Sequence, residues 1–574
     1  MSKGDLEELD IQKLIVEKRL EQSNGSGFAT MKRNKRALGT CLFVSLGGIL
    51  YGYNQGMFGQ VSSMHSFGET VGIGKIQDNP TLQGLLTSIL ELGAWVGVLM
   101  NGYVADALGR RASVVIGCIL FNIGVIIQAV ARDADYGYIL GGRFVIGLGV
   151  GVLSMVVPLY NSEISRAEIR GANTAIYQLS ITFGIMISYW ITYGTNFIGG
   201  TGDNQSQASW LVPMCIQAAP AIILAVFIYS FPESPRWLIN VGQEDKALEV
   251  LAWLRETEQE NVGLQIEFLE MKAQKIFEQT LETEAYPHLQ DGTKMSKFKI
   301  NLNQYKSMVT HLPTFKRVSV ACLTMVFQQW TGAYNFILYY APFIFASLGL
   351  SGNTTSLLAS GVVGIVMFLC TIPAVMWVDK VGRKPLLISG ALVMGLCHFV
   401  VAGILGGYSD NIGSHKAAGW VAVVFIWIFA GAFGYSWGPC AWVIVAEVFP
   451  LGMRAKGVSL GSSFNWLMNF SVAISTPKFV ANAKYGAYIF LGLMCVIGSM
   501  YVYFMVPETK NKTLDELDEV FGDFTGTSKK ESELREKILK QVGLVDLLVG
   551  SDKELDSFRS KPEVEYKEKE AHSE

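Results

Sequence analysis

The sequence predicts an all-α membrane protein with twelve transmembrane helices in two six-helix bundles. Half of its 574 residues are hydrophobic and only 17% are charged, so its mean hydropathy is +0.32. Twelve apolar runs are long enough to cross a bilayer, which takes about 20 residues per helix. Motifs of the first half also return in the second half. Together these observations exclude a single soluble core.

The chain divides into five expected parts. Residues 1–37 form a charged N-terminal tail with no secretory signal pattern, and residues 232–317 form a charged linker. In the linker, apolar residues recur at helical spacing over 247–256 and 262–279, which predicts amphipathic helices. The polar tail 507–574 is expected to be largely disordered beyond one or two helical turns. The two bundles, 38–231 and 318–506, contain the runs 38–58, 84–104, 112–131, 138–160, 174–194 and 212–231, then 318–346, 356–378, 385–407, 418–445, 456–476 and 485–506.

Lysine and arginine gather in alternate loops, such as those at Arg110 and Arg383, whereas 195–211 and 349–355 have none. By the positive-inside rule the basic side is cytoplasmic. An even number of spans then places both termini in the cytoplasm of a multi-pass plasma-membrane protein. Asn204 and Asn353 fall on the outside as candidate glycan acceptors.

Several classes of protein are excluded by composition. The balance of 46 basic and 49 acidic residues predicts no nucleic-acid partner. The eight cysteines and six histidines are scattered, so we expect no metal and no cofactor. Without a nucleophile and base pair or a phosphate loop, we expect no enzyme. The oligomeric state is left open.

An internal repeat relates the two halves. Asp106 to Arg111 returns as Asp379 to Lys384, and Pro232-Glu233 returns as Pro507-Glu508. Two six-helix halves in the same orientation are the parallel repeat of the major facilitator superfamily, whose substrates bind between the halves. The repeated charges either decorate cytoplasmic turns or form ion pairs that gate the cytoplasmic side. We expect gating by Asp106, Arg110, Arg111, Glu163 and Arg170, and by Asp379, Arg383, Glu447 and Arg454.

Polar side chains inside the spans predict a binding site. Intramembrane amides are expensive and usually face a cavity, and each offers the donor and acceptor that neighbouring hydroxyls require. An indole such as Trp442 or Trp466 can stack on a pyranose. The alternative is that the amides only bond helices to one another. The candidate sugar-binding residues are Gln178, Gln328, Gln329, Asn335, Trp442, Asn465 and Asn469.

Three motifs resemble the sugar porter family over about residues 40–520: Gly52-Tyr53-Asn54-Gln55-Gly56, Pro232-Glu233-Ser234-Pro235-Arg236 and Gln328-Gln329-Trp330-Thr331-Gly332. The residues of these motifs are most similar to those of fungal monosaccharide transporters, including a yeast branch that carries arabinose, xylose and glucose. The resemblance implies that Gln178, Gln328, Gln329, Asn335, Asn469 and Trp442 contact the sugar.

The chain departs from the family pattern in the seventh span. Ala333-Tyr334 occupies the place of one residue, so a π-bulge or a break near Gly332 is needed to keep Asn335 in register. Met367 stands where many relatives have a sugar-binding asparagine, and Gly434 where some have an acid. These changes leave sugar specificity open.

Energy coupling shows a further departure. Proton-driven relatives commonly have an aspartate at Asn54, with an arginine matching Arg143 as its counter-charge. Glu91 lies at a similar depth, so we expect a relocated acid that pairs with Arg143 and carries the proton. The alternative is a fixed structural ion pair in a carrier that works by facilitated diffusion.

The sequence therefore predicts import of neutral monosaccharides, such as arabinose, xylose and glucose-type hexoses, leaning to sugar:proton symport. The partners expected are the sugar, protons and the lipid bilayer. A facilitated-diffusion uniporter and a non-transporting sugar sensor are the alternatives.

Overall fold

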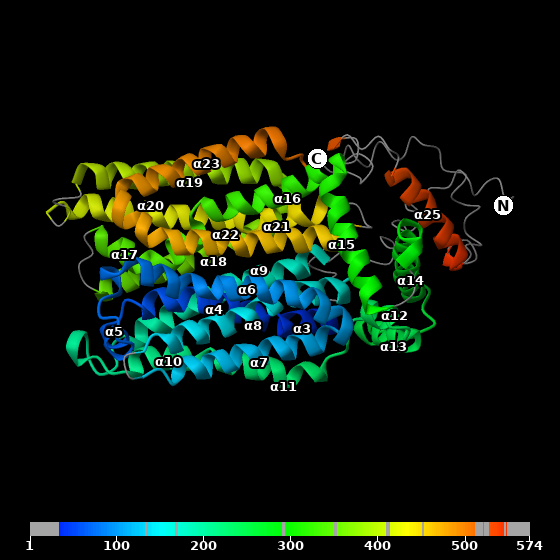
Figure 1. Cartoon of the computed structure of the whole chain (residues 1–574), viewed down its shortest axis with the longest axis horizontal. Helices are drawn as coiled ribbons and strands as arrows, with labels where there is room; N and C mark the ends of the chain where they lie inside the picture. The colour runs from blue at the N-terminus through cyan, green and yellow to red at the C-terminus, as the bar shows by residue number, and fades with distance from the viewer. Residues whose placement is uncertain are drawn as a thin grey trace.

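The computed structural model describes residues 34–132, 135–166, 170–289, 293–348, 353–408, 412, 414–449, 453–510, 520–521, 527–544 and 547. Within these residues the regular structure is helical throughout. The membrane helices lie in two layers, the first half below and the second half above, with the linker helices at one end (Figure 1). We call that end the linker side.

The first half supplies the six expected spans. Spans one and six are each divided into shorter helices, with Ser45 and Gln217 at the joints. The helices of this half are α3 (Lys35–Val44), α4 (Leu46–Val61), α6 (Pro80–Leu108), α7 (Arg110–Ala129), α8 (Gly137–Ile164), α9 (Arg170–Thr195), α10 (Ala208–Ile216), α11 (Ala218–Phe227) and η4 (Ile228–Ser230). Short helices α5 (His65–Thr70), η1 (Ile76–Asp78) and η3 (Gly202–Asn204) lie in the connections.

The second half supplies the other six spans, and its spans seven and ten are broken. These helices are α16 (Leu312–Trp330), η6 (Ala333–Leu338), α17 (Tyr339–Ser347), α18 (Asn353–Val381), α19 (Arg383–Tyr408), α20 (Lys416–Tyr435), α21 (Trp437–Glu447), α22 (Arg454–Ala483) and α23 (Tyr485–Met505). All twelve predicted spans are thus helical, and the predicted fold class is confirmed.

Nine of the twelve spans are long and apolar enough, within the described residues, to cross a membrane by composition alone. The other three are α9, the span formed by α16 and α17, and α22. These are the spans that carry most of the candidate amides. Their lower hydropathy is expected if their polar side chains face the interior of the protein rather than lipid.

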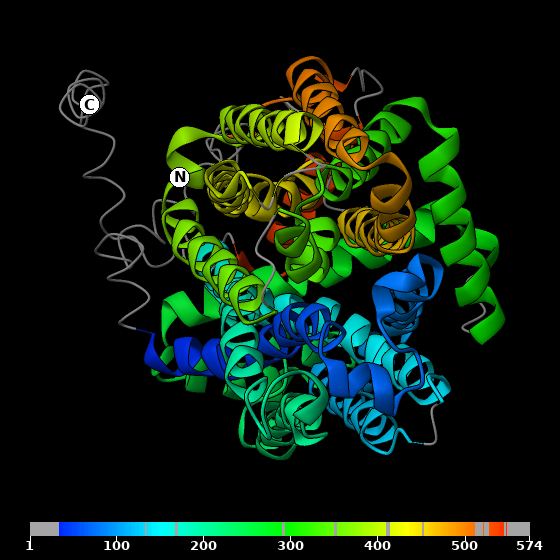
Figure 2. The same ribbon diagram turned by 90° about the vertical axis from the view of Figure 1, so that its left-hand side faces the viewer.

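The two halves meet through α6 on α22, α9 on α18 and α4 on α17. Two glycines mark close contact at the end opposite the linker side, which Figure 2 shows face on. A Cβ at Gly59 would lie 2.2 Å from the backbone oxygen of Tyr339, and one at Gly84 would lie 2.6 Å from that of Ile474. The halves are therefore closed on each other at the end away from the linker.

The linker consists of α12 (Pro235–Asn240), α13 (Glu244–Arg255), α14 (Val262–Ala285), η5 (Pro287–Leu289) and α15 (Lys294–Thr310). Helices α13 and α14 cover the two stretches predicted to be amphipathic. In the tail, α25 (Thr527–Gln541) is longer than the one or two turns expected. Its Ile538 and Leu539 are buried against Phe277 of α14, and this apolar contact explains the longer helix.

Candidate functional site

The seventh span breaks directly after its pair of glutamines. Helix α16 ends at Trp330, Gly332 has a left-handed φ of +87°, and Ala333–Leu338 form a π-helix before α17 begins. The wider π turn accommodates the additional residue, as predicted. The backbone oxygen of Thr331, freed at the break, lies 3.0 Å from His398 Nε2. Because a carbonyl only accepts, this ring nitrogen carries the proton.

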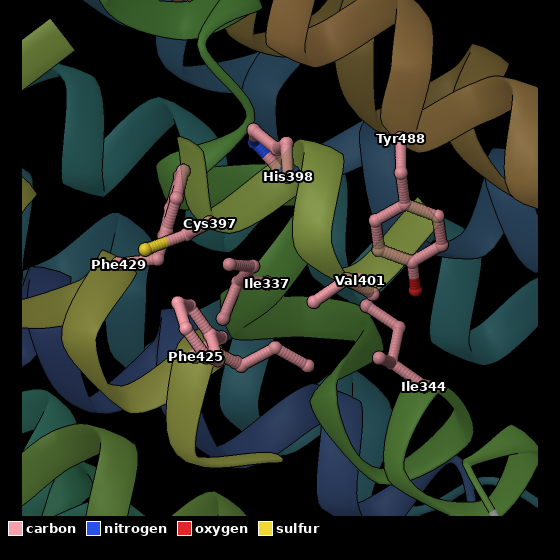
Figure 3. Close-up of a pocket in the computed structure, with 9 residues that line it drawn as sticks. Ile337, Ile344, Cys397, His398, Val401, Phe425, Phe429 and Tyr488 are labelled. Atoms are coloured by element: carbon pink, nitrogen blue, oxygen red, sulfur yellow. The ribbon is translucent and has the colours of Figure 1, made fainter. Parts of the chain in front are cut away.

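A cavity lies behind the break, inside the second half (Figure 3). Its lining is mostly apolar and includes Ile337 and Ile344 from the broken span, with His398, Phe429 and Tyr488 opposite. The Tyr488 hydroxyl is buried and has no hydrogen-bond partner. None of the candidate amides with a described side chain lines this cavity, so it is distinct from the predicted sugar site.

Gln328 joins three helices. Its Nε2 donates to the backbone oxygens of Trp437 and Gly438, at 2.8 and 3.3 Å, where span ten is interrupted between α20 and α21. Its Oε1 accepts from Asn465 Nδ2 of α22 at 2.7 Å. Both side chains are buried. The structure thus brings two of the predicted residues together, in contacts that also bond helix to helix.

Gln329, the next residue, has a different environment. It is 1% exposed, yet its Oε1 has no hydrogen-bond partner among the described residues. A buried amide oxygen without a donor is costly unless water or a bound molecule supplies one. On α4, Gln55 shows the same feature: its Nε2 donates to Tyr51, whereas its buried Oε1 has no partner.

Aromatic rings span the boundary between the halves. The ring of Tyr51 in α4 lies 5.1 Å from that of Trp466 in α22. On the same boundary, Trp95 Nε1 of α6 donates to Ser463 Oγ of α22 at 2.8 Å.

The remaining candidates are distributed over the interior. Asn469 is buried on α22, whereas Gln178 on α9 and Trp442 on α21 are half-buried. Asn335 lies within η6, and its side chain is outside the described part of the structure. Met367 is buried on α18.

A second polar group surrounds Arg143. This fully buried guanidinium of α8 lies 3.6 Å from the centre of the Phe58 ring. It donates to the backbone oxygen of Thr87 at 3.1 Å and to Asn54 Oδ1 at 3.5 Å. Asn54 in turn donates to Gln217 Oε1 at 2.9 Å, at the joint of span six. The predicted neighbourhood of Asn54 and Arg143 is therefore present.

Glu91 belongs to this group but has a partner that the sequence did not reveal. Its Oε1 accepts from the hydroxyl of Tyr339, at 2.7 Å, and its Oε2 is buried without a partner. In the described part of the structure Glu91 and Arg143 do not form the expected ion pair. The hydroxyl of Tyr339 instead contacts both side chains, and the centre of its ring lies 5.9 Å from the guanidinium. The only sequence signal was a tyrosine pair just after the predicted break.

On the linker side, the charges of the first half form one network. Arg110 makes a bidentate contact with Glu163, at 2.8 and 2.9 Å, and also contacts Asp106. The carboxylate of Glu233 accepts from the backbone nitrogens of Arg110 and Arg111, at 3.1 and 3.3 Å. Glu233 thus satisfies the N-terminus of α7, whose preceding residue, Gly109, has a φ of +91°.

The second half repeats this network. Arg383 contacts Glu447 at 2.8 Å, and Glu508 accepts from the backbone nitrogens of Arg383 and Lys384 at 3.1 and 3.0 Å. Burial alone would raise the pKa of Glu508, but the backbone donors, including that of Lys510, outweigh it and lower the pKa below its ordinary 4.5.

These ion pairs join helices within each half, α7 to α8 and α19 to α21, rather than one half to the other. The Nε of Arg454 has no partner. The side chains of Arg170 and Asp379 are outside the described part of the structure. In the described part of the structure, these ion pairs therefore stabilise the packing of each half.

The fold, the repeated network and the interior amides define a multi-pass carrier of the major facilitator type. Residues 40–521 match the family model described as "Sugar (and other) transporter". The chain belongs to this sugar transporter family.

Similar proteins include transporters and a sensor. The high-affinity glucose transporter 1 of Candida albicans is 31% identical, over 83% of this chain and 84% of its own length. The high glucose sensor of Saccharomyces cerevisiae is also 31% identical, over 84% of this chain and 60% of its own length. A structure of the proton:xylose symporter XylE bound to 6-bromo-6-deoxy-D-glucose is 27% identical, with a TM-score of 0.67, over 85% of this chain and 99% of that chain.

Proposed function

We propose that this protein imports neutral monosaccharides, both pentoses and hexoses, across the plasma membrane by alternating access. The observation that carries the proposal is the buried, unpartnered Oε1 of Gln329 at the break of span seven. A sugar hydroxyl is the donor that this oxygen lacks. Uncharged amides also favour an uncharged polyol, because a carboxylate substrate would call for an arginine or lysine.

Sidedness follows from charge. The linker side carries the basic loops at Arg110 and Arg383, so we assign it to the cytoplasm, together with both termini. The contacts at Gly59 and Gly84 then lie on the outer side. The structure accordingly represents a conformation whose outer side is closed.

We further propose sugar:proton symport with Glu91 as the proton carrier. Its support is a carboxylate that is wholly buried and has one oxygen without a partner, in a span where an acid is costly. Facilitated diffusion is the alternative, with Glu91 as a fixed structural acid.

The transport proposal is tested by uptake of labelled xylose, arabinose and glucose in yeast that lacks its own sugar carriers. Saturable uptake of at least one sugar is expected, and competition by unlabelled sugars gives the preference. A protein that reaches the surface and moves none of a full panel of pentoses and hexoses would instead support the sensor alternative.

Proton coupling is tested separately, by the pH of an unbuffered cell suspension. Adding the best substrate should make the medium more alkaline, and Glu91→Gln should abolish this response. Facilitated diffusion is supported if the wild type moves sugar without any pH change. Continued accumulation of sugar by Glu91→Gln would remove Glu91 from the proton pathway.

A further inference from the structure

We propose that the hydroxyl of Tyr339 couples proton release from Glu91 to closure of the outer side. This inference rests on the proposed symport and adds a positioning residue to it. Tyr339 belongs to the second half and Glu91 to the first, so their hydrogen bond forms only when α17 lies against the first half.

The geometry places this bond at the contact between the halves. Tyr339 is the first residue of α17, is 1% exposed, and has its backbone against Gly59 of α4. Its hydroxyl donates to Glu91 Oε1 at 2.7 Å. When α17 moves away from α4, the hydroxyl moves with it, because Tyr339 is part of α17. Glu91 Oε1 then loses the hydrogen-bond donor that it has among the described residues.

The chemistry gives the direction of coupling. A hydroxyl donor stabilises an ionised carboxylate more than a protonated acid, because the bond to the anion is charge-assisted. The donor is present in the closed conformation and absent when the outer side opens. The hydroxyl therefore offsets part of the cost of burying the charge and makes the proton easier to lose in the closed conformation than it would be without Tyr339. By reciprocity, loss of the proton strengthens this contact between the halves. A proton taken up from outside is released after the outer side has shut.

Two other ionisable groups lie near Glu91, but neither forms the hydrogen bond that Glu91 gains from α17 on closure. Arg143 of α8 is in the same half as Glu91, so its distance from Glu91 does not depend on α17. Arg143 also contacts the hydroxyl of Tyr339, and this contact is lost by the same movement of α17. Tyr340 of α17 is also near and contacts Thr87 of α6, but its hydroxyl donates to the backbone oxygen of Ala473 at 2.9 Å rather than to Glu91. Tyr340 thus offers a matched control on the same helix.

The test is Tyr339→Phe, which removes the hydroxyl and keeps the ring. We compare two assays in the same cells: accumulation of sugar against a gradient, and exchange of labelled for unlabelled sugar, which needs no net proton release. Accumulation and proton uptake per sugar should fall about tenfold or more, the loss expected for one hydrogen bond to a charged group. Exchange should remain near the wild-type rate, and Tyr340→Phe should keep both activities.

A double variant tests whether the hydroxyl acts through Glu91. Glu91→Gln combined with Tyr339→Phe should behave as Glu91→Gln alone, because the amide already lacks the charge. The inference is overturned if Tyr339→Phe still accumulates sugar with protons as the wild type does. It is also overturned if exchange falls equally, or if Tyr340→Phe has the same effect. A wild type that moves sugar without protons refutes the symport proposal itself, and the inference with it.

Discussion

At the scale of single residues, the two neighbouring glutamines of span seven have separate roles. Gln328 fills its hydrogen bonds with Asn465 and with the interrupted tenth span, whereas Gln329 keeps an unpaired buried oxygen. Gln328 therefore stabilises the packing of helices in the second half, and Gln329 is the more direct candidate for contact with the sugar. A sugar that also reaches Gln328 must share or replace the bond to Asn465.

Substitution should separate these roles. Gln329→Ala should raise the apparent KM for sugar by an amount equivalent to about 1–3 kcal/mol and leave the folded protein as stable as before, because no protein partner is lost at Oε1. Gln328→Ala should lower both affinity and thermal stability, since it removes an acceptor of Asn465 Nδ2 and the donor to the backbone oxygen of Trp437. Uptake kinetics and melting of the purified protein measure the two effects.

The control for both is Gln128→Ala. Gln128 is a fully buried amide of α7 with neither side-chain atom paired, on a helix that packs on α8 and α11 inside the first half. Its loss should leave sugar affinity unchanged. Equal losses of affinity in all three variants, or none in Gln329→Ala, would show that the sugar site lies elsewhere.

The sequence was informative about single residues wherever a polar type stood out from an apolar span. Gln328, Asn465, Glu91 and Arg143 were identified in this way. Their partners were not, because Tyr339 is separated from Glu91 by 248 positions and Gln217 from Asn54 by 163. Periodicity reports which residues are buried, but it does not report which distant helix faces them.

At the scale of elements, the N-termini of α7 and α19 depend on one carboxylate each. Glu233 and Glu508 follow the last span of each half and return to accept from free backbone N–H groups. A carboxylate at such a position is favoured by the helix dipole as well as by the hydrogen bonds. The repeat of Pro-Glu is visible in the sequence. The helix N-terminus that each glutamate satisfies is evident only from the structure.

Glu508→Gln should lower the stability of the purified protein by about 1 kcal/mol at pH 7. Because the pKa of Glu508 is lowered in the folded protein, its stabilisation is present above the ordinary value of 4.5 and is lost as pH falls through the folded-state pKa. The difference in melting temperature between variant and wild type should therefore be constant at neutral pH and shrink under acid conditions.

A matched control is Glu536→Gln in α25, which removes an exposed pair with Lys540. Such surface pairs contribute little, so this change should have almost no effect on melting. If Glu508→Gln were equally silent at pH 7, the carboxylate would not be what holds the start of α19.

The broken seventh span shows how far elements could be predicted. The additional residue at Ala333-Tyr334 required either a bulge or a break, and the structure has both, a π-helix after a left-handed Gly332. The division of span ten at Ser436 was not predicted. It lies between two apolar helices, so hydropathy shows no interruption there.

At the scale of the whole molecule, the halves approach each other closely at the end opposite the linker side, which we propose is the outer side. Glycines make this contact close, since a side chain at Gly84 would meet the backbone of Ile474. Alternating access requires this contact to form and separate in every cycle. Residues at the contact should therefore control the balance of conformations more than the binding of sugar.

Gly84→Leu should hold the outer side open. A leucine at this position would destabilise the closed conformation by about 1–3 kcal/mol through overpacking. This cost would shift the equilibrium between closed and open conformations roughly five- to 150-fold toward the open one. Uptake should fall accordingly, while sugar added from outside still binds to the purified protein. Gly102→Leu, on the same helix with nothing within 4 Å of its Cβ, should transport normally. Normal uptake by Gly84→Leu would mean that outer closure at this point is not part of the cycle.

Entrance counterflow in liposomes tests the central claim most directly. The purified protein is reconstituted into vesicles preloaded with unlabelled sugar, and labelled sugar is added outside. We expect a transient accumulation of label with the preferred monosaccharide, slowed in Gln329→Ala and absent in protein-free vesicles. No counterflow with any pentose or hexose, by folded protein that still binds sugar, would contradict transport.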